Sequence, residues 1–313
     1  MSNNKIRVAI CNCGGTIFSH ISKDGTIALN SPESVSNSQI FRLLGDVEFD
    51  EIVVPLYSSE NATVNDYRLV FKEIIEYFDS NRENTNCLMI MHGTDSMAYF
   101  AQLAYRALSF IGVPVVIVGS KFTPDTPGSD AFSNVKEAIR ILLDAVEGKS
   151  QVFKVVFSHS KKLETESVNA WQIEDADIDG DYGCFESRPI AKTDIEQYEK
   201  RARAFIKRQI GVKDRVLTIH NSPSFPFSSV VIDRSKIGAI LIQSFHSGTA
   251  NSAEGEGSLV GLVSLAGKEG IKSYIAPVVA KNNNYESESI LRKIGVIPCL
   301  DVPIEGAWAE IVL

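Results

Sequence analysis

The pattern that most constrains this chain is an alternation of short apolar runs with longer amphipathic stretches. The runs are nearly all apolar, as strands buried on both faces of a parallel sheet must be. The stretches between them carry apolar residues at helical spacing. Together they predict an α/β fold with parallel strands. The predicted strands cover residues 5–11, 51–56, 86–91, 113–118, 153–157, 216–220, 237–243 and 273–278.

The clearest predicted helix begins at Thr63, because Thr63 and Asp66 have the spacing of a capping box. Tyr67, Phe71 and Phe78 follow at intervals that place them on one helix face. This segment is expected to pack on the sheet. Further helices are predicted over residues 96–111, 131–147, 194–209, 257–269 and 286–294.

A chain of 313 residues is long enough for about two domains, each with its own core. An acidic, glycine-containing stretch begins near residue 174, and a highly charged helical stretch follows it. We therefore predict a larger N-terminal domain over 1–190 that carries the active-site loops, a linker over 191–212, and a smaller C-terminal α/β domain over 213–313.

The composition argues against several classes of partner. The chain has 31 Lys and Arg against 39 Asp and Glu, a net charge of −8, and so lacks the basic character of a nucleic-acid-binding protein. No apolar run approaches the roughly 20 residues that cross a bilayer, and the first residues lack the apolar core of a signal peptide. Five scattered cysteines suit a reducing compartment. We expect a cytoplasmic protein with no nucleic-acid or membrane partner.

The candidate chemistry lies in loops that directly follow predicted strands, because ligands of open α/β sheets bind outside the carboxyl ends of the strands. Cys13 precedes the Gly14-Gly15 turn, whose amides could hold an oxyanion. Thr94 and Asp95 precede a helix. They either cap that helix or hold a substrate ammonium and assist a nucleophile. Cys11 and Cys13, with His20 nearby, lack a second ligand pair, so no metal site is expected.

Several of these segments together resemble the bacterial-type L-asparaginase/glutaminase family, which includes the asparaginase-like subunit of an archaeal glutamyl-tRNA amidotransferase. The similarity covers essentially the whole chain. Residues 13–17, Cys-Gly-Gly-Thr-Ile, resemble the family's Thr-Gly-Gly-Thr-Ile, and residues 92–96, His-Gly-Thr-Asp-Ser, resemble its His-Gly-Thr-Asp-Thr. Residues 128–134 resemble its Ser-Asp-Gly-x-x-Asn element, and residues 247–251 resemble its glycine-rich C-terminal loop.

The resemblance implies a two-domain α/β fold and hydrolysis of the side-chain amide of asparagine, glutamine or a related small amide. The reaction would pass through a covalent acyl intermediate and would need no metal or cofactor. The implied catalytic residues are Cys13, at the family's threonine nucleophile position, with Thr94 and Asp95. The implied oligomer is a homodimer or homotetramer. By the same resemblance, substrate binding is assigned to Ser58, Ser59, Asp95 and Thr16, with Asn251 completing a neighbouring subunit's site.

Three departures from the family pattern keep a second interpretation open. A cysteine replaces the nucleophilic threonine, residues 18–52 contain no tyrosine, and residues 163–191 contain no lysine where the family has one that assists the reaction. Lys161 or Lys162 could replace that lysine. His92 is expected to bond the loop backbone, and a Cys13–His92 pair is the alternative. The second interpretation is an asparaginase-like protein that binds an amino acid or serves as a regulatory or partner subunit without hydrolysing an amide.

Overall fold

The computed structural model describes residues 6–30, 47–158, 160–165, 168–174, 190–255, 257–279 and 285–313. The acidic stretch predicted after residue 174 lies largely outside them. The chain forms two compact units, one of Met1–Ile178 with Ala191–Lys207 and one of Asp179–Ile190 with Arg208–Leu313. Among the described residues, no helix has the length and apolar character needed to span a membrane.

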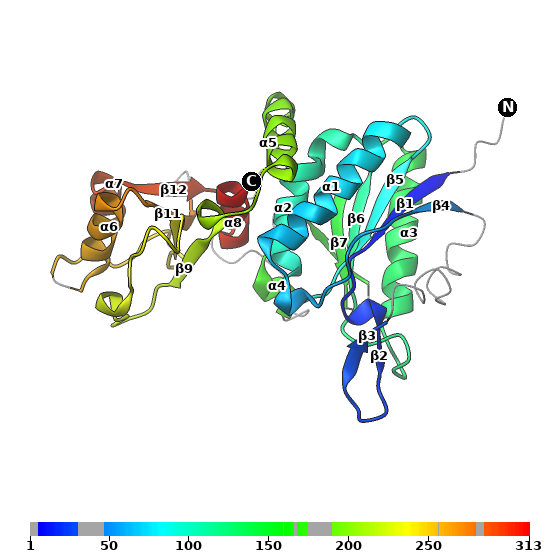
Figure 1. Ribbon diagram of the computed structural model, residues 1–313, viewed down its shortest axis with the longest axis horizontal. Helices are drawn as coiled ribbons and strands as arrows, with labels where there is room; N and C mark the ends of the chain where they lie inside the picture. Colours follow the sequence, from blue (N-terminus) through cyan, green and yellow to red (C-terminus); the bar gives the residue numbers. More distant parts are fainter. Residues whose placement is uncertain are drawn as a thin grey trace. The chain divides into compact units, whose positions relative to one another are not determined.

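The first unit is built on a six-stranded sheet with the order β4-β1-β5-β6-β7-β8 (Figure 1). All neighbouring strands are parallel except β7 and β8, which pair antiparallel. In chain order the strands are β1 (Arg7–Asn12), β4 (Glu48–Ile52), β5 (Cys87–Met91), β6 (Val115–Val118), β7 (Phe153–Phe157) and β8 (Lys161–Glu164). A separate hairpin joins β2 (Ser19–Ile21) to β3 (Ile27–Leu29).

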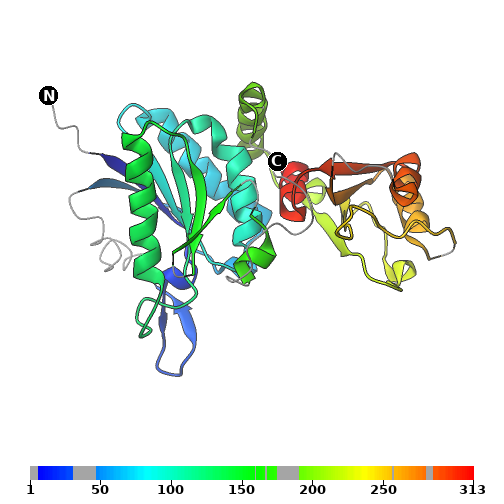
Figure 2. The same cartoon turned by 180° about the vertical axis from the view of Figure 1, so that it is seen from behind.

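Helices cover both faces of this sheet. Helix α3 (Ala131–Glu147) covers one face and stands in front of the sheet in Figure 2. Its buried side chains pack against alternate residues of four strands, such as Val8 and Ile10 of β1. The other face is covered by α1 (Val64–Asn81) and α2 (Met97–Leu108), which contact each other. Burial on both faces explains why the central strands are continuous apolar runs.

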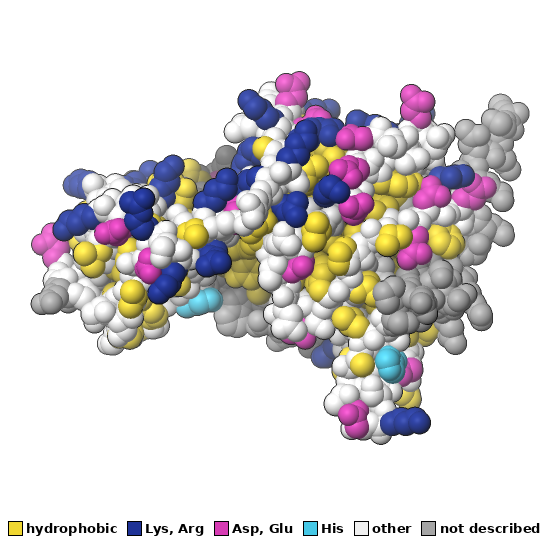
Figure 3. Space-filling model, in the orientation of Figure 1, with side chains coloured by type: hydrophobic (Ala, Val, Ile, Leu, Met, Phe, Trp, Pro, Cys, Tyr) yellow, Lys and Arg dark blue, Asp and Glu magenta, His cyan; other side chains and the backbone are white. Residues whose placement is uncertain are grey.

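Helix α5 (Ile195–Lys207) packs on α1 and α2, although it follows them by more than 85 residues of chain. Arg203 of α5 makes a bidentate ion pair with Asp79 of α1, with N–O distances of 2.8 Å. Acidic and basic side chains stand next to one another over these helices in Figure 3. The segment predicted as a linker therefore contains a helix that belongs to the first unit, and the proposed boundaries at 190 and 213 stay predictions.

The second unit contains a parallel sheet with the order β12-β11-β10-β9. Helices α6 and α7 pack on one face, and α8 packs on the other. The elements are β9 (Val216–His220), β10 (Ala239–Gln243), α6 (Leu259–Lys268), β11 (Lys272–Val278), α7 (Glu286–Lys293), β12 (Val296–Leu300) and α8 (Ile304–Val312). The two-domain α/β class predicted from the sequence is confirmed.

The sequence missed some elements at the edges of the sheets. The strand predicted over 51–56 is β4, which ends at Ile52. It lies at the sheet edge, and three of its five residues are acidic, so no continuous apolar run marks its bounds. Strand β12 is also an edge strand, and Pro298 within it weakens its strand pattern, so it was not predicted. The capping box predicted at Thr63 and Asp66 is confirmed by reciprocal hydrogen bonds of 2.7 and 3.3 Å.

Candidate active site

The order of the sheet places the predicted site loops next to one another. Strands β4, β1, β5, β6 and β7 are successive neighbours and all run in the same direction. Their carboxyl ends therefore lie along one edge, with about 4.8 Å between adjacent strands. The residues that follow each strand there are candidates for the site.

Glycines bring three of these loops into direct backbone contact. Gly15 has φ +87°, and a β-carbon on it would lie 2.2 Å from Gly93 Cα. A β-carbon on Gly93 would in turn lie 2.4 Å from Ser59 Oγ. Only a residue without a β-carbon fits such distances. The loops after β1, β4 and β5 are thus held together by Gly15, Gly93 and Ser59.

A chain of hydrogen bonds connects the loop after β5 to the loop after β4. The Asp95 carboxylate accepts a bond from Ser59 Oγ at 3.3 Å. Ser96 Oγ donates to the Ser59 carbonyl at 2.6 Å, and Tyr67 donates its hydroxyl proton to Ser96 Oγ at 2.8 Å. Ser59 is buried, whereas Asp95 is exposed. These hydrogen bonds fix Asp95 at the edge of the sheet, and its carboxylate stays exposed to a ligand.

Cys13 lies at the end of β1 with its side chain only 1% exposed. Its amide donates to the Met91 carbonyl at 2.9 Å, and its carbonyl accepts from the Tyr57 amide at 3.1 Å. Its Sγ lies 4.0 Å from Cys11 Sγ. The Gly14 amide, which could have served an oxyanion, donates to Asn12 Oδ1 at 3.0 Å. The thiol is therefore enclosed by packed side chains.

Tyr57 is a neighbour of Cys13 that the sequence did not single out. It comes from the loop after β4, outside the segment in which the absence of a tyrosine was noted. Burial, and then the nearby Cys13 thiol, raise the pKa of Tyr57 well above its ordinary value.

His92 takes the structural role predicted for it. Its ring is fully buried and stacks on Phe100, with ring centroids 4.2 Å apart. Nδ1 donates to the Gly93 carbonyl at 2.7 Å. Burial lowers the pKa of His92 to about 4, so the ring is neutral at neutral pH. Its Nε2 has no partner among the described residues, so the structure gives no hydrogen bond for a Cys13–His92 pair.

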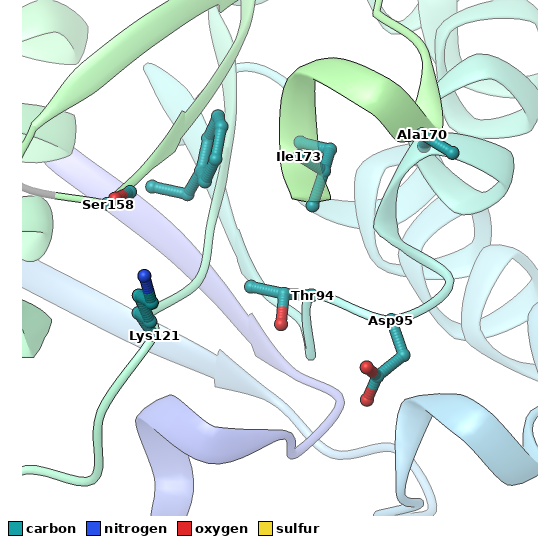
Figure 4. A pocket seen from close by; sticks show the side chains of 8 residues that line it. Thr94, Asp95, Lys121, Ser158, Ala170 and Ile173 are labelled. Carbon is teal, nitrogen blue, oxygen red and sulfur yellow. The ribbon is translucent and has the colours of Figure 1, made fainter. Parts of the chain in front are cut away.

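A cavity of about 260 Å³ opens beside this constellation, over the ends of β5, β6 and β7. Thr94 and Asp95 form part of its wall, as the sequence predicts for a substrate site. Cys13 is not among the lining residues. The lining residues are Thr94, Asp95, Ala98, Lys121, Phe157, Ser158, Ala170 and Ile173 (Figure 4).

Lys121 and Ser158 are lining residues that sequence reasoning missed. Lys121 is the third residue after β6, and Ser158 directly follows β7 with φ +41°. A positive φ is unusual for serine and is frequent at binding sites. Applying the strand-end rule to every predicted strand would have found both residues. Lys162, the replacement considered for the missing lysine, pairs with Glu137 at 2.9 Å.

The element at residues 128–134 has a clear structural role. The buried Asp130 carboxylate accepts bonds from the amides of Lys121 and Phe122 at 3.0 to 3.1 Å. Asn134 donates to Asp130 at 2.9 Å and accepts from the Ser160 amide at 2.7 Å. These bonds position the loops after β6 and β7, and therefore one wall of the cavity.

The remaining predicted substrate-binding residues are less constrained by the structure. Ser58 and Thr16 are half-buried, and Thr16 begins the short helix η1 (Thr16–Phe18). Asn251 lies in the second unit, where its side chain accepts a bond from the Ala253 amide at 2.9 Å. The roles of all three residues stay predictions.

An open, largely parallel sheet with a cavity beside the loops at its carboxyl strand ends is typical of α/β proteins that bind small molecules. The family model described as "Asparaginase, N-terminal" matches residues 7–177. The chain belongs to the asparaginase family.

Relatives and solved structures agree with this assignment. A glutamyl-tRNA(Gln) amidotransferase subunit of Methanosarcina barkeri is 31% identical over 48% of this chain and 34% of its own length. An L-asparaginase of Bacillus licheniformis is 28% identical over 42% of this chain and 40% of its own length. This chain thus spans well under half the length of both proteins.

Similarity of fold extends over both units. The thermostable L-asparaginase from Thermococcus kodakarensis superposes with a TM-score of 0.65 over 97% of this chain and 91% of its own, at 19% identity. A probable cytoplasmic L-asparaginase from Campylobacter jejuni gives a TM-score of 0.62 over 97% of this chain and 93% of its own, at 18% identity.

Proposed function

We propose that this chain is an amidohydrolase of the L-asparaginase class that hydrolyses the side-chain amide of asparagine, glutamine or a related small amide. The cavity is the observation that carries the proposal, because it presents the Thr94 hydroxyl and the Asp95 carboxylate together at the carboxyl edge of a parallel sheet. Family membership supports it.

In this proposal Asp95 binds the α-ammonium of the substrate, since it is an exposed carboxylate that a hydrogen bond from Ser59 holds in place. Ser58 and Thr16 contribute hydroxyls on the neighbouring loops for the α-carboxylate. Ser59 would join them by turning its hydroxyl proton from Asp95 to the substrate. Asn251 would complete the pocket of a second copy in a homodimer or homotetramer.

Cys13 is the proposed nucleophile. Its sulfur bonds to the amide carbon, the C–N bond breaks, and the departing nitrogen takes the thiol proton and leaves as ammonia. Water then attacks the thioester, releasing the acid and returning the proton to sulfur. Thr94 is proposed to assist these proton transfers from the cavity wall. Because the thiol is 1% exposed, the loop after β1 must move before attack.

The burial of Cys13 favours a second candidate function. A protein that only binds an amino acid needs Asp95 and the hydroxyls near it. Asp95 lines the cavity and is bonded by Ser59, and neither contact involves the thiol. In that case the chain is an asparaginase-like binding or partner subunit. Seven of the similar proteins carry the name of an amidotransferase subunit, which is compatible with such a role.

The test is ammonia release from asparagine and glutamine by the wild-type chain, Cys13→Ala and Cys13→Thr. The proposal predicts release by the wild type, at least a 100-fold loss in Cys13→Ala, and retained turnover in Cys13→Thr. Equal release by wild type and Cys13→Ala would remove the thiol from the mechanism. If no amide is hydrolysed and aspartate raises the melting temperature, the binding function replaces the hydrolytic one.

A further inference from the structure

The cavity carries one negative and one positive side chain on different strand ends. Asp95 follows β5, whereas Lys121 follows β6, the next strand in the sheet. Thr94 lies between Asp95 and Lys121 in Figure 4, and Ser158 lies on the Lys121 side. A ligand whose ammonium binds Asp95 would therefore reach past Thr94 toward Lys121.

The cavity as a whole is much larger than a molecule of ammonia. The whole cavity measures about 260 Å³, whereas ammonia is similar in size to water, which occupies about 30 Å³ in the liquid. The wall also includes apolar side chains. These are Ala98, Phe157, Ala170 and Ile173. An apolar wall that ends in a cation suits an organic group with a negative charge.

The backbone of Lys121 is held in place while its ammonium is left for a ligand. The Asp130 side chain is 1% exposed, and its carboxylate accepts hydrogen bonds from the backbone amides of Lys121 and Phe122. The Lys121 ammonium lies 5.9 Å from the centroid of the Phe122 ring. In the described ranges, no carboxylate forms an ion pair with Lys121.

We infer that Lys121 is a specificity-determining residue that selects amides whose leaving amine carries a carboxylate, such as the β-aspartyl or γ-glutamyl conjugate of an amino acid. The inference rests on the proposed function and extends it to substituted amides. Hydrolysis would break the bond between the side-chain carbonyl carbon and nitrogen. Water would supply one oxygen of the new carboxylate. Its two protons would be transferred to the departing nitrogen, which leaves as an ammonium group.

The test compares β-aspartyl-alanine with β-aspartyl-alaninamide, which differ only in the charge of the leaving group. The measurements are the dissociation constant by calorimetry and kcat/KM for release of the amine. The wild type is expected to prefer the carboxylate form by about fivefold to tenfold, the size of one charge-assisted contact near a surface. Lys121→Met should remove the preference, and Lys121→Glu should reverse it. Lys136→Met, which changes an exposed lysine of α3, should preserve it.

Two outcomes would overturn the inference. One is a wild-type protein with no preference, or a preference that Lys121→Met leaves intact. The other is an equal loss of kcat/KM for asparagine and both conjugates in Lys121→Met, since Lys121 would then serve the reaction at Thr94 and not the leaving group. If no compound is hydrolysed, the proposed function fails, and the ratio of dissociation constants still tests the role of Lys121.

Discussion

The loops that follow β1 and β5 end neighbouring strands and touch at Gly15 and Gly93, yet they treat their polar side chains in opposite ways. The loop after β5 places Asp95 in the wall of a cavity, whereas the loop after β1 encloses Cys13 among packed side chains. Both loops resemble motifs of the same family. A sequence motif can therefore determine the path of the backbone without determining whether its side chains are exposed to a ligand.

The largest expected effect concerns the contact that joins the two loops. Gly15→Ala would place a methyl group 2.2 Å from Gly93 Cα, a distance that forces the backbones apart. We expect a loss of more than about 4 kcal/mol in the free energy of unfolding. Gly25→Ala is the matched control, because Gly25 also has a positive φ, +85°, but nothing lies within 4 Å of its added β-carbon.

The control should lose only about 1 to 2 kcal/mol, the cost of the left-handed conformation for a residue with a side chain. Urea denaturation measures both variants. Equal losses in Gly15→Ala and Gly25→Ala would show that the loops after β1 and β5 are not held together by this contact.

The next largest expected effect is the pH dependence of stability caused by His92, the buried residue of the loop after β5. His92 has a pKa of about 4 in the folded chain, below its ordinary 6.5, because burial disfavours its charged form. The unfolded chain therefore binds a proton in the window between these values while the folded chain does not. His92 therefore does not lower the free energy of unfolding above pH 6.5. It lowers this free energy progressively as the pH falls from 6.5 to about 4.

The expected loss over this window is about 3 kcal/mol. Denaturation of the wild type and of His92→Gln at pH 7 and pH 4 measures it. The wild type should lose about 3 kcal/mol more than the variant. An identical pH dependence in the two proteins would mean that His92 has the same pKa in the folded and unfolded chains, contrary to the effect of its burial.

A smaller loss of stability is expected when the wall of the cavity is changed at Asp130. Asp130→Asn weakens the bonds that the buried carboxylate accepts from the amides of Lys121 and Phe122. We expect a loss of about 2 to 3 kcal/mol in the free energy of unfolding, typical of hydrogen bonds to a buried charge. Asp144→Asn is the control, since its exposed ion pair with Arg140 contributes less than about 1 kcal/mol. Equal losses would contradict the role given to Asp130.

Much of this fold could be predicted because burial on both faces leaves a continuous apolar run in the sequence. Strands β5, β6 and β7 were found for that reason, and the capping box at Thr63 marked α1. The edge strands were predicted less evenly. Strand β9 was found, but the bounds of β4 were misplaced and β12 was missed, because acidic residues in β4 and Pro298 in β12 interrupt the apolar pattern.

The site was predictable only in part. The contact of the loops carrying Cys13, Ser59 and Asp95 follows from parallel strand order and from glycines that the sequence displays. The neighbours of Cys13 include Tyr57 from another loop, whose amide donates to the Cys13 carbonyl, so no local pattern reveals the burial of the thiol. Lys121 follows a predicted strand by three residues, so the strand-end rule could have located it, whereas its hydrogen bonding to Asp130, nine residues further along the chain, has no local pattern.

The most direct test of the account is a calorimetric titration of the full chain with L-aspartate, compared in the wild type, Asp95→Asn and Cys13→Ala. We predict that Asp95→Asn weakens binding by about 10- to 100-fold, since the ligand ammonium loses its charged partner. Cys13→Ala should bind within about twofold of the wild type, because its side chain does not line the cavity. The contradicting result is unchanged affinity in Asp95→Asn, or an equal loss in both variants.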